Sequence, residues 1–374
     1  MPLEIPEFRP FLQKLLVGLI LILVPLTVFG FYVAVEGDSH MRQMNGENFR
    51  ALTLNSADSA SQFIATCVRD ASVIANSPAS LQAVAEANRQ YEHLSEEAVS
   101  NKINAIEQAW AAQTDTASSK ILASDLANQL RRMRELNPTL LKITIADVTG
   151  ATVAATERPI HYFQTDREYW RALSSRSQGT IHVSDLRYDD LSRLYYVSIA
   201  YPILQQGTGR FIGAVTAMAD VSPLFAQLNR WQLGRTGRLF LVRDDGTVVE
   251  APGVTPAMRM KSEEYAAIRD ALGSLRGRET GYIYATLSNG EAYLIGFADT
   301  GLKEAYPNLP WIVLASQEAR ELNSPVRNMT VFALLAMILS LLMLSLLGAY
   351  VFLHRKQKLE DIETPEDKGS TVAA

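Results

Sequence analysis

Two long apolar runs without a charged residue lie near the two ends of the sequence and limit what it can fold into. The first, Leu15–Val35, has 21 residues, and the second, Val331–Leu353, has 23. Each is long enough to cross the ~30 Å hydrocarbon core of a bilayer as a helix. The first run exceeds the roughly 7–15 apolar residues of a signal peptide, and no Ala-x-Ala cleavage site follows it. The sequence therefore predicts transmembrane helices at 15–35 and 329–353, with residues 36–328 between them.

Charged residues beside these runs predict their orientation. Arg9 and Lys14 precede the first run, and a basic cluster at 354–358 follows the second. Glu36 and Asp38 stand on the other side of the first run. Because cytoplasmic flanks are enriched in Lys and Arg, both termini are expected in the cytoplasm and the central part outside it.

The central part changes from a helical to a strand-like pattern near Pro138. Before it, small and apolar residues recur at helical spacing over 40–136, with a break at Ser77-Pro78, which predicts a helical stalk over 36–139. A second stretch of this stalk is expected to be helical from Glu96 to Leu136. After it, short alternating runs bounded by turn residues predict strands.

The order strand, turn, strand, helix, three strands occurs twice after the stalk. The expected strands are 140–147, 151–155, 180–184, 194–204, 210–219, 238–242, 247–250, 281–286, 292–297 and 311–316. The expected helices are 167–173, 223–231 and 263–272. The fold class is therefore α+β, with a long N-terminal helix and two antiparallel-sheet modules at 140–234 and 235–328.

Composition and motifs argue against several classes of function. The one cysteine, Cys67, precludes an internal disulfide, and a net charge of −5 without basic tracts argues against nucleic-acid binding. The sequence contains none of the motifs of metalloproteases, serine hydrolases or nucleotide-binding loops. His161 and His182 could approach one another, but two isolated histidines are more often surface residues than a metal site. We therefore expect no enzyme, no cofactor and no metal.

One stretch, residues 162–220, combines side chains that suit a small polar ligand. A guanidinium holds a carboxylate, a carboxylate pairs with an ammonium, and ring faces exclude water. The candidate ligand-binding residues in this stretch are Tyr162, Arg167, Tyr169, Trp170, Arg187, Asp189 and Asp220. Ordinary surface charges at a sheet edge explain these residues equally well when they are considered alone.

The whole arrangement resembles the double-Cache sensor domains of bacterial membrane receptors. The likeness covers roughly residues 40–325. It is carried by Thr-Ile-Ala-Asp-Val-Thr-Gly at 144–150, Asp-Arg-Glu-Tyr-Trp at 166–170, Ser-Ile-Ala-Tyr-Pro-Ile at 198–203, and 213–224. The resemblance implies PAS-like antiparallel sheets, of which the membrane-distal one binds amino acids, amines or carboxylates.

The resemblance also implies roles for individual residues. Relatives that bind amino acids share a pattern of a Tyr, four residues, an Arg, one residue and two aromatic residues. An Asp follows at the end of a later strand. Tyr162, Arg167, Tyr169, Trp170 and Asp220 follow this spacing. Arg167 would then hold the ligand carboxylate, with Tyr162 and Trp170 as walls. Asp220 would pair with an ammonium group.

The sequence departs from this pattern in two places. The aromatic pair has the reverse of its usual order, and Arg187 stands where many relatives carry Tyr. A second guanidinium would favour a dicarboxylate or another strongly anionic ligand, although a solvated charge at a strand end explains Arg187 slightly better. Asp189 is expected at the rim of the site. Asp220 has an equal claim as the N-cap of the helix at Ser222-Pro223.

The helical stalk and the C-terminal tail indicate which proteins this chain would associate with. Relatives form dimers through the long helix, and the small residues Ala51, Ala57, Ala60 and Ser61 would let two such helices approach closely, which predicts a homodimer. The tail 354–374 is expected to be disordered and too short for an output domain. A separate signalling protein, of kinase, phosphatase or chemoreceptor type, is therefore the expected receiver.

These observations favour a sensory subunit in the bacterial inner membrane, with residues 1–14 and 354–374 in the cytoplasm. It would bind a small anionic or zwitterionic ligand outside the membrane. The alternative is a ligand-free structural or protein-interaction module whose pocket is filled by its own side chains. An open cavity in the distal module, lined by the candidate residues, would distinguish the two.

Overall fold

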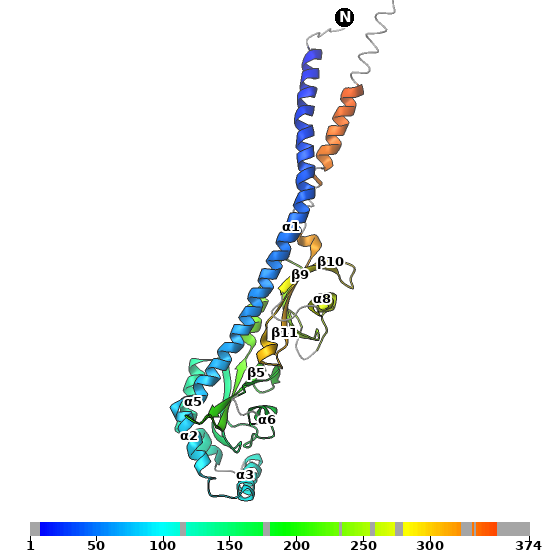
Figure 1. Ribbon diagram of the computed structural model, residues 1–374. Coiled ribbons are helices and arrows are strands. Elements are labelled where there is room, and N and C mark those ends of the chain that lie inside the picture. Colours follow the sequence, from blue (N-terminus) through cyan, green and yellow to red (C-terminus); the bar gives the residue numbers. More distant parts are fainter. Residues whose placement is uncertain are drawn as a thin grey trace, which may run out of the picture. The chain divides into compact units, whose positions relative to one another are not determined.

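The computed structural model describes residues 8–112, 117–174, 180–231, 234–254, 259–273, 280–322, 331–332 and 334–349 (Figure 1). The expected tail at 354–374 lies outside the described residues. The chain divides into two compact units, one of residues 46–318 and the other of 1–45 together with 319–374. Both sheets belong to the 46–318 unit.

The N-terminal part is a long helix followed by shorter ones. The helices are α1 Phe8–Ala75, α2 Pro78–Arg89, α3 Glu96–Ala111, α4 Ala117–Ala123, α5 Asp125–Leu136, α6 Glu168–Ser174, α7 Ser222–Asn229, α8 Glu263–Gly273, α9 Leu302–Ala305 and α10 Ala319–Leu322. The predicted break lies where α1 ends and α2 begins. Ser77 caps α2 by accepting a hydrogen bond from the Ser80 N–H at 3.2 Å, and Pro78 occupies the first turn, where its missing N–H costs nothing.

The stretch 96–136, predicted to be helical, is not one continuous helix. The stretch is divided into α3, α4 and α5, and Ser124 interrupts it between the last two. Its side chain accepts a hydrogen bond from the Ala127 N–H at 3.1 Å, so it starts a new helix instead of continuing the previous one.

The apolar run 15–35 is helical as part of α1, and residues 331–332 and 334–349 of the second run are helical too. Within the part of the chain that the structure describes, no helix reaches both the length and the hydropathy needed to cross a membrane.

The strands form two antiparallel sheets in the 46–318 unit. They are β1 Leu140–Asp147, β2 Thr152–Ala155, β3 His182–Val183, β4 Arg187–Asp189, β5 Leu194–Leu204, β6 Phe211–Asp220, β7 Arg238–Arg243, β8 Val248–Glu250, β9 Thr280–Thr286, β10 Ala292–Asp299 and β11 Trp311–Glu318. The order is β2-β1-β6-β5-β3 in the distal sheet, with β4 paired to β5, and β8-β7-β11-β10-β9 in the proximal sheet. In each sheet the first two strands of the module form a hairpin at one edge. The last strand of the module lies next to this hairpin, and strands that precede the last one in the sequence follow. This shared connectivity confirms the repeated order that the sequence predicts.

The two faces of the distal sheet differ sharply in polarity. Odd-numbered residues of the central strands are fully buried, among them Ile143, Ile145, Val197, Ile199, Val215 and Ala217. They form the face toward α2 and α5, both of which contact β1. Even-numbered residues of the same strands form the other face. By register Thr144 lies opposite Thr216, and Lys142 opposite Met218. Alternation with period two therefore gives the sheet one apolar and one largely polar face.

The equivalent face of the proximal sheet is filled. Phe240, Val242, Ile295, Ile312 and Leu314 from its strands are buried. Together with Tyr265 and Ile268 of α8, they form one hydrophobic cluster. This module therefore uses as core the face that the distal module leaves polar.

Helix α1 packs closely on the proximal sheet within the 46–318 unit. A Cβ built at Gly296 of β10 would lie 2.9 Å from the carbonyl oxygen of Phe49, so glycine permits this approach. Ala57 and Ala60 are 1% and 0% exposed within the same unit. Their small size therefore serves packing inside the chain, and the argument for a homodimer from these two residues is wrong. Ala51 is exposed and stays available to a partner.

Candidate functional site

The polar face of the distal sheet opens into a cavity of about 270 Å³. Its floor comes from β1, β5 and β6, with Lys142, Thr144, Tyr196, Ser198, Thr216 and Met218. Its walls come from the segment 157–169 on one side and from β3, β4 and the turn at Leu191 on the other. The volume suits a ligand of a few heavy atoms, such as an amino acid.

Helix α6 explains why this half of the sheet stays open. Its residues Trp170 and Leu173 are buried on the other half, where the floor carries the small residues Ala146, Ala200 and Ala214. Trp170 also meets Phe211 edge to face at 5.6 Å between ring centroids. The indole thus fills the space above the alanines and stops short of the strand positions with polar side chains.

A partly buried lysine on the cavity floor pairs with two carboxylates of the walls. The Lys142 ammonium lies 2.9 Å from a Glu157 oxygen and 3.3 Å from an Asp189 oxygen. Burial works to lower the pKa of Lys142, but the hydrogen bonds and charges of the two carboxylates outweigh it and raise that pKa. Asp189 also accepts hydrogen bonds from the Ser192 N–H and hydroxyl at 3.1 and 2.7 Å.

Asp189 lies inside the cavity rather than at its rim, contrary to the expectation. Its side chain is 15% exposed, against 43% for Glu157. Burial works to raise the pKa of Asp189, but the hydrogen bonds from Ser192 and the charge of Lys142 outweigh it and lower that pKa. The carboxylate is therefore ionised and already paired.

Two guanidinium groups line the cavity and keep their donors available. Arg167 lies 3.6 Å from an Asp166 oxygen, and Arg187 lies 3.8 Å from a Glu168 oxygen. Both separations exceed a hydrogen bond. Neither guanidinium donates a hydrogen bond to any other residue that the structure describes, so both can take an incoming carboxylate.

Tyr169 supplies the aromatic surface of the cavity. Its hydroxyl donates to Gln164 Oε1 at 2.9 Å and accepts from the Thr216 hydroxyl at 3.4 Å. The Gln164 amide donates in turn to the His161 carbonyl at 2.7 Å. This chain of hydrogen bonds fixes the ring between the floor and the 157–169 wall.

Three of the predicted site residues do not line this cavity. Tyr162 is buried beside Trp110, with ring centroids 5.6 Å apart, in a cluster formed with α3 and α4. Trp170 is in the core under α6. Asp220 lies on the cavity face by register but accepts hydrogen bonds from the Ser222 N–H and hydroxyl at 2.8 and 2.6 Å. Asp220 therefore fixes the first residue of α7, although the N-cap position belongs to Val221.

Lys142 and Glu157 line the cavity and were not predicted from the sequence. The signal for Lys142 is present in the alternation of β1, where a lysine follows two leucines and precedes an isoleucine. A cation at an alternate position of an otherwise apolar strand marks a polar sheet face. Glu157 lies in a loop and carries no comparable pattern.

His161 and His182 both line the cavity, and His161 Nδ1 lies 3.2 Å from Glu107. Among the residues that the structure describes, no three His, Cys, Asp or Glu side chains are placed to hold a metal ion.

Solved structures to which this chain is similar include sensory domains of bacterial receptors. The sensory domain of the Campylobacter jejuni chemoreceptor Tlp3 (CcmL) matches at 12% identity with a TM-score of 0.51, over 76% of this chain and 98% of that one. The same domain with isoleucine bound matches at 12% identity with a TM-score of 0.50, over 76% and 97%. The ligand-binding domain of the Pseudomonas aeruginosa PAO1 chemoreceptor PctB with L-Arg gives 17% identity, a TM-score of 0.42, and coverage of 76% and 96%. Curated proteins give no match.

The model of a protein family covers most of the sequence. The dCache_1 model, described as Cache domain, matches residues 39–326, which include the end of the long helix and both sheets. The match agrees with the repeated sheet connectivity and with the extent of the resemblance predicted from the sequence. This chain belongs to the Cache domain family.

Proposed function

We propose that this protein is a membrane-anchored extracytoplasmic sensory subunit that binds a small anionic or zwitterionic molecule in the distal cavity. The ligand is an amino acid, an amine or a carboxylate, of which the carboxylate-bearing classes fit best. The protein has no catalytic activity in this proposal, and it passes its signal to a separate signalling protein in or under the membrane.

One observation carries the proposal: two guanidinium groups that have no hydrogen-bond partner among the described residues open onto a polar cavity. A ligand carboxylate would lie between Arg167 and Arg187. A ligand ammonium would face Glu168, whose side chain is 69% exposed and which has no partner nearer than 3.8 Å among the described residues. The cavity is open rather than filled by the chain's own side chains, which favours a binding protein over a ligand-free structural module.

Solved structures support the choice of ligand class. The Tlp3 sensory domain, which shares the fold, holds isoleucine in one of its structures. In the present cavity Met218 and Tyr169 provide apolar surface, and Thr144, Ser198 and Thr216 provide hydroxyl groups. This combination accommodates an α-amino acid with a short side chain.

Exposed apolar residues at the mouth of the cavity suggest how binding could be coupled to movement. Ile160 and Leu191 stand on opposite walls and are 85% and 86% exposed. Closure of the two loops over a ligand would bury both side chains, at about 25 cal/mol per Å² of apolar area. The hydrogen bond of 2.6 Å from Asn137, at the end of α5, to Asp70 of α1 connects this module to the long helix.

The membrane anchoring rests on the two uncharged runs of the sequence and on the basic residues beside them. It is consistent with the Cache assignment, because the family match ends at residue 326, just before the second run.

A binding experiment tests the proposal. The full chain, purified in detergent, is screened against amino acids, amines and carboxylates by thermal shift, because a ligand of the folded state raises the melting temperature. The best ligand is then titrated calorimetrically. Arg167→Ala should weaken its binding by about 2–5 kcal/mol, since the ligand anion loses a charge-assisted pair in a partly dry site. Arg167→Lys should recover part of this loss, because an ammonium cannot reproduce the planar two-point contact.

Arg171→Ala is the matched control. This residue is exposed on the same helix, α6, and does not line the cavity. The proposal is contradicted if no compound binds, or if Arg167→Ala binds the ligand as tightly as the Arg171→Ala control while melting like it.

A further inference from the structure

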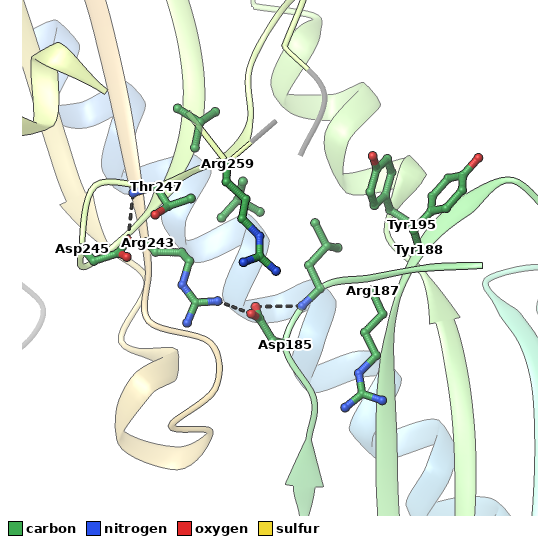
Figure 2. Close-up of a pocket in the computed structure, with 11 residues that line it drawn as sticks. Asp185, Arg187, Tyr188, Tyr195, Arg243, Asp245, Thr247 and Arg259 are labelled. Atoms are coloured by element: carbon green, nitrogen blue, oxygen red, sulfur yellow. Dashed lines mark hydrogen bonds and ion pairs between the residues drawn. The ribbon is translucent and has the colours of Figure 1, made fainter. Parts of the chain in front are cut away.

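A second cavity, of about 430 Å³, lies between the distal and the proximal module (Figure 2). Asp185, Leu186, Arg187, Tyr188 and Tyr195 line it from the distal side. On the proximal side it is lined by Arg243, Arg259 and the hairpin residues Asp245, Thr247, Val248 and Val249. We call it the intermodule cleft. It is separate from the distal cavity, although Arg187 lines both.

The two carboxylates of the cleft are already engaged. Asp185 forms an ion pair with Arg243 and accepts a hydrogen bond from the Leu186 N–H at 2.8 Å. Asp245 lies 2.8 Å from the Lys261 ammonium and accepts from the Thr247 N–H at 2.9 Å. The hydrogen bond from Lys261 holds the pKa of Asp245 well below its ordinary value, so this carboxylate stays ionised and paired.

The guanidinium groups of the cleft are less well compensated. Arg259 has no hydrogen-bond or ion-pair partner among the described residues, and Figure 2 shows its side chain directed into the cleft, toward Asp185 and the end of Arg243. Arg187 has only the Glu168 carboxylate, at 3.8 Å. Asp185 pairs with Arg243 and Asp245 with Lys261, so Arg259 is left without a compensating carboxylate among the described residues, and the potential beside it is positive. Figure 2 shows the Arg187 side chain extending away from the ends of Arg243 and Arg259.

We propose that the intermodule cleft is a second binding site, which takes a small oxyanion with two or more negative charges. Arg259 and Arg243, both of the proximal module, would hold it. Planar guanidinium groups match the oxygens of phosphate, sulfate and polycarboxylates, and each can donate two parallel hydrogen bonds. A multiply charged anion is favoured because it can satisfy both guanidinium groups at once, which a monocarboxylate cannot.

An anion bound in the cleft would affect the contact between the two modules. The cleft is crossed by the Asp185–Arg243 ion pair, which joins the modules. A bound oxyanion on Arg243 would compete with Asp185 for this guanidinium, and Asp185 shortly precedes β4, whose residues Arg187 and Asp189 line the distal cavity.

Titration with inorganic phosphate tests the site. The purified full chain is titrated calorimetrically at constant ionic strength in a chloride buffer, with sulfate, citrate and acetate as further arms. Phosphate should bind saturably at one site, citrate or sulfate should compete with it, and acetate should not. Arg259→Gln should weaken phosphate binding roughly tenfold or more, the effect of losing a hydrogen bond to a charged group.

Two variants act as controls for this titration. Arg132→Gln removes the same charge from an exposed position on α5 that lines neither cavity, and it should bind phosphate like the wild type. Arg167→Ala, which changes only the distal cavity, should also leave phosphate binding unchanged. The proposal is overturned if none of phosphate, sulfate and citrate binds saturably, or if Arg259→Gln and Arg132→Gln bind phosphate equally well.

Discussion

At the scale of residues, the distal cavity is organised by Lys142. This lysine on the floor pairs with Glu157 and Asp189 of the two walls, and the guanidinium groups of Arg167 and Arg187 line the same cavity. Removing the ammonium would leave a mostly buried carboxylate without its cation, which is costly in a partly dry environment. Lys142 therefore sets the charge that a ligand meets.

A double-mutant cycle measures this pairing. Lys142→Met and Asp189→Asn, alone and combined, should show a coupling energy of about 0.5–3 kcal/mol in the free energy of unfolding. The Lys261–Asp245 pair serves as control, since its side chains are 60% and 56% exposed, and exposed pairs contribute about 0–1 kcal/mol. Chemical denaturation of the variants gives both values. A coupling energy for Lys142 and Asp189 no larger than that of the exposed pair would contradict this role.

The structure brings four of the seven predicted site residues together in one cavity. Arg167, Tyr169, Arg187 and Asp189 line the cavity, because short polar segments at strand ends and helix starts face outward from the apolar core. Tyr162 and Trp170 do not line it, since a ring beside polar residues in the sequence can turn either way. Tyr162 joined the core because α3 brings Trp110 against it, a contact between segments that no local pattern shows.

At the scale of elements, β3 connects the distal cavity to the proximal module. His182 lines the cavity, and the Asn308 amide, in the loop between α9 and β11, lies 3.3 Å from His182 Nε2. The same amide nitrogen donates to the Val183 carbonyl at 3.0 Å, which fixes its orientation. Because an amide nitrogen can only donate, Nε2 must accept, and the imidazole is neutral.

This contact predicts a dependence on pH. Burial lowers the pKa of His182 below its ordinary value. The charge of Glu168 opposes this shift and the charge of Arg187 adds to it, and the pKa remains lowered. Below about pH 6.5 the unfolded chain then binds more protons than the folded one, so stability falls as the pH falls. The melting temperature of the wild type should therefore drop more between about pH 7.5 and about pH 5.5 than that of His182→Gln, which does not titrate there. An equal drop in both proteins would show that His182 has no such role.

Most helices and strands were predictable because the spacing of apolar residues along the sequence differs clearly between the two. Strand β5 has the predicted bounds, and β7, β10 and β11 differ from prediction only at their ends. The three-residue strand β4 and the four-residue helix α9 were not predicted, since they are too short to show a period. The opening of the cavity was not predictable either, because it depends on how far α6 extends over the sheet.

At the scale of the whole molecule, the two modules share a connectivity but use it differently. The proximal sheet buries large apolar side chains under α8, whereas the distal sheet keeps polar residues facing a cavity. Rigid packing in one module and an open site in the other is what a sensor needs, because a ligand can shift an equilibrium only where it makes contacts of its own.

The proposed topology gives a prediction at this scale. Residues 36–328 should be cleaved by a protease added to cells whose outer membrane has been permeabilised, while tags at both termini stay protected. The reason is that basic residues precede the first apolar run and follow the second, and such residues favour the cytoplasmic side of the membrane. Immunoblotting of each terminal tag reads the result. Cleavage of the tags together with protection of the central region would reverse the orientation.

The most direct test of the central claim is a crystal structure of the protein with the ligand that the screen identifies. We expect ligand density in the distal cavity, with the carboxylate within hydrogen-bonding distance of the Arg167 guanidinium and the rest of the ligand over Tyr169 and Thr216. We also expect Ile160 and Leu191 to be less exposed than in the ligand-free structure. Ligand density in the proximal module, with the distal cavity empty, would contradict the account.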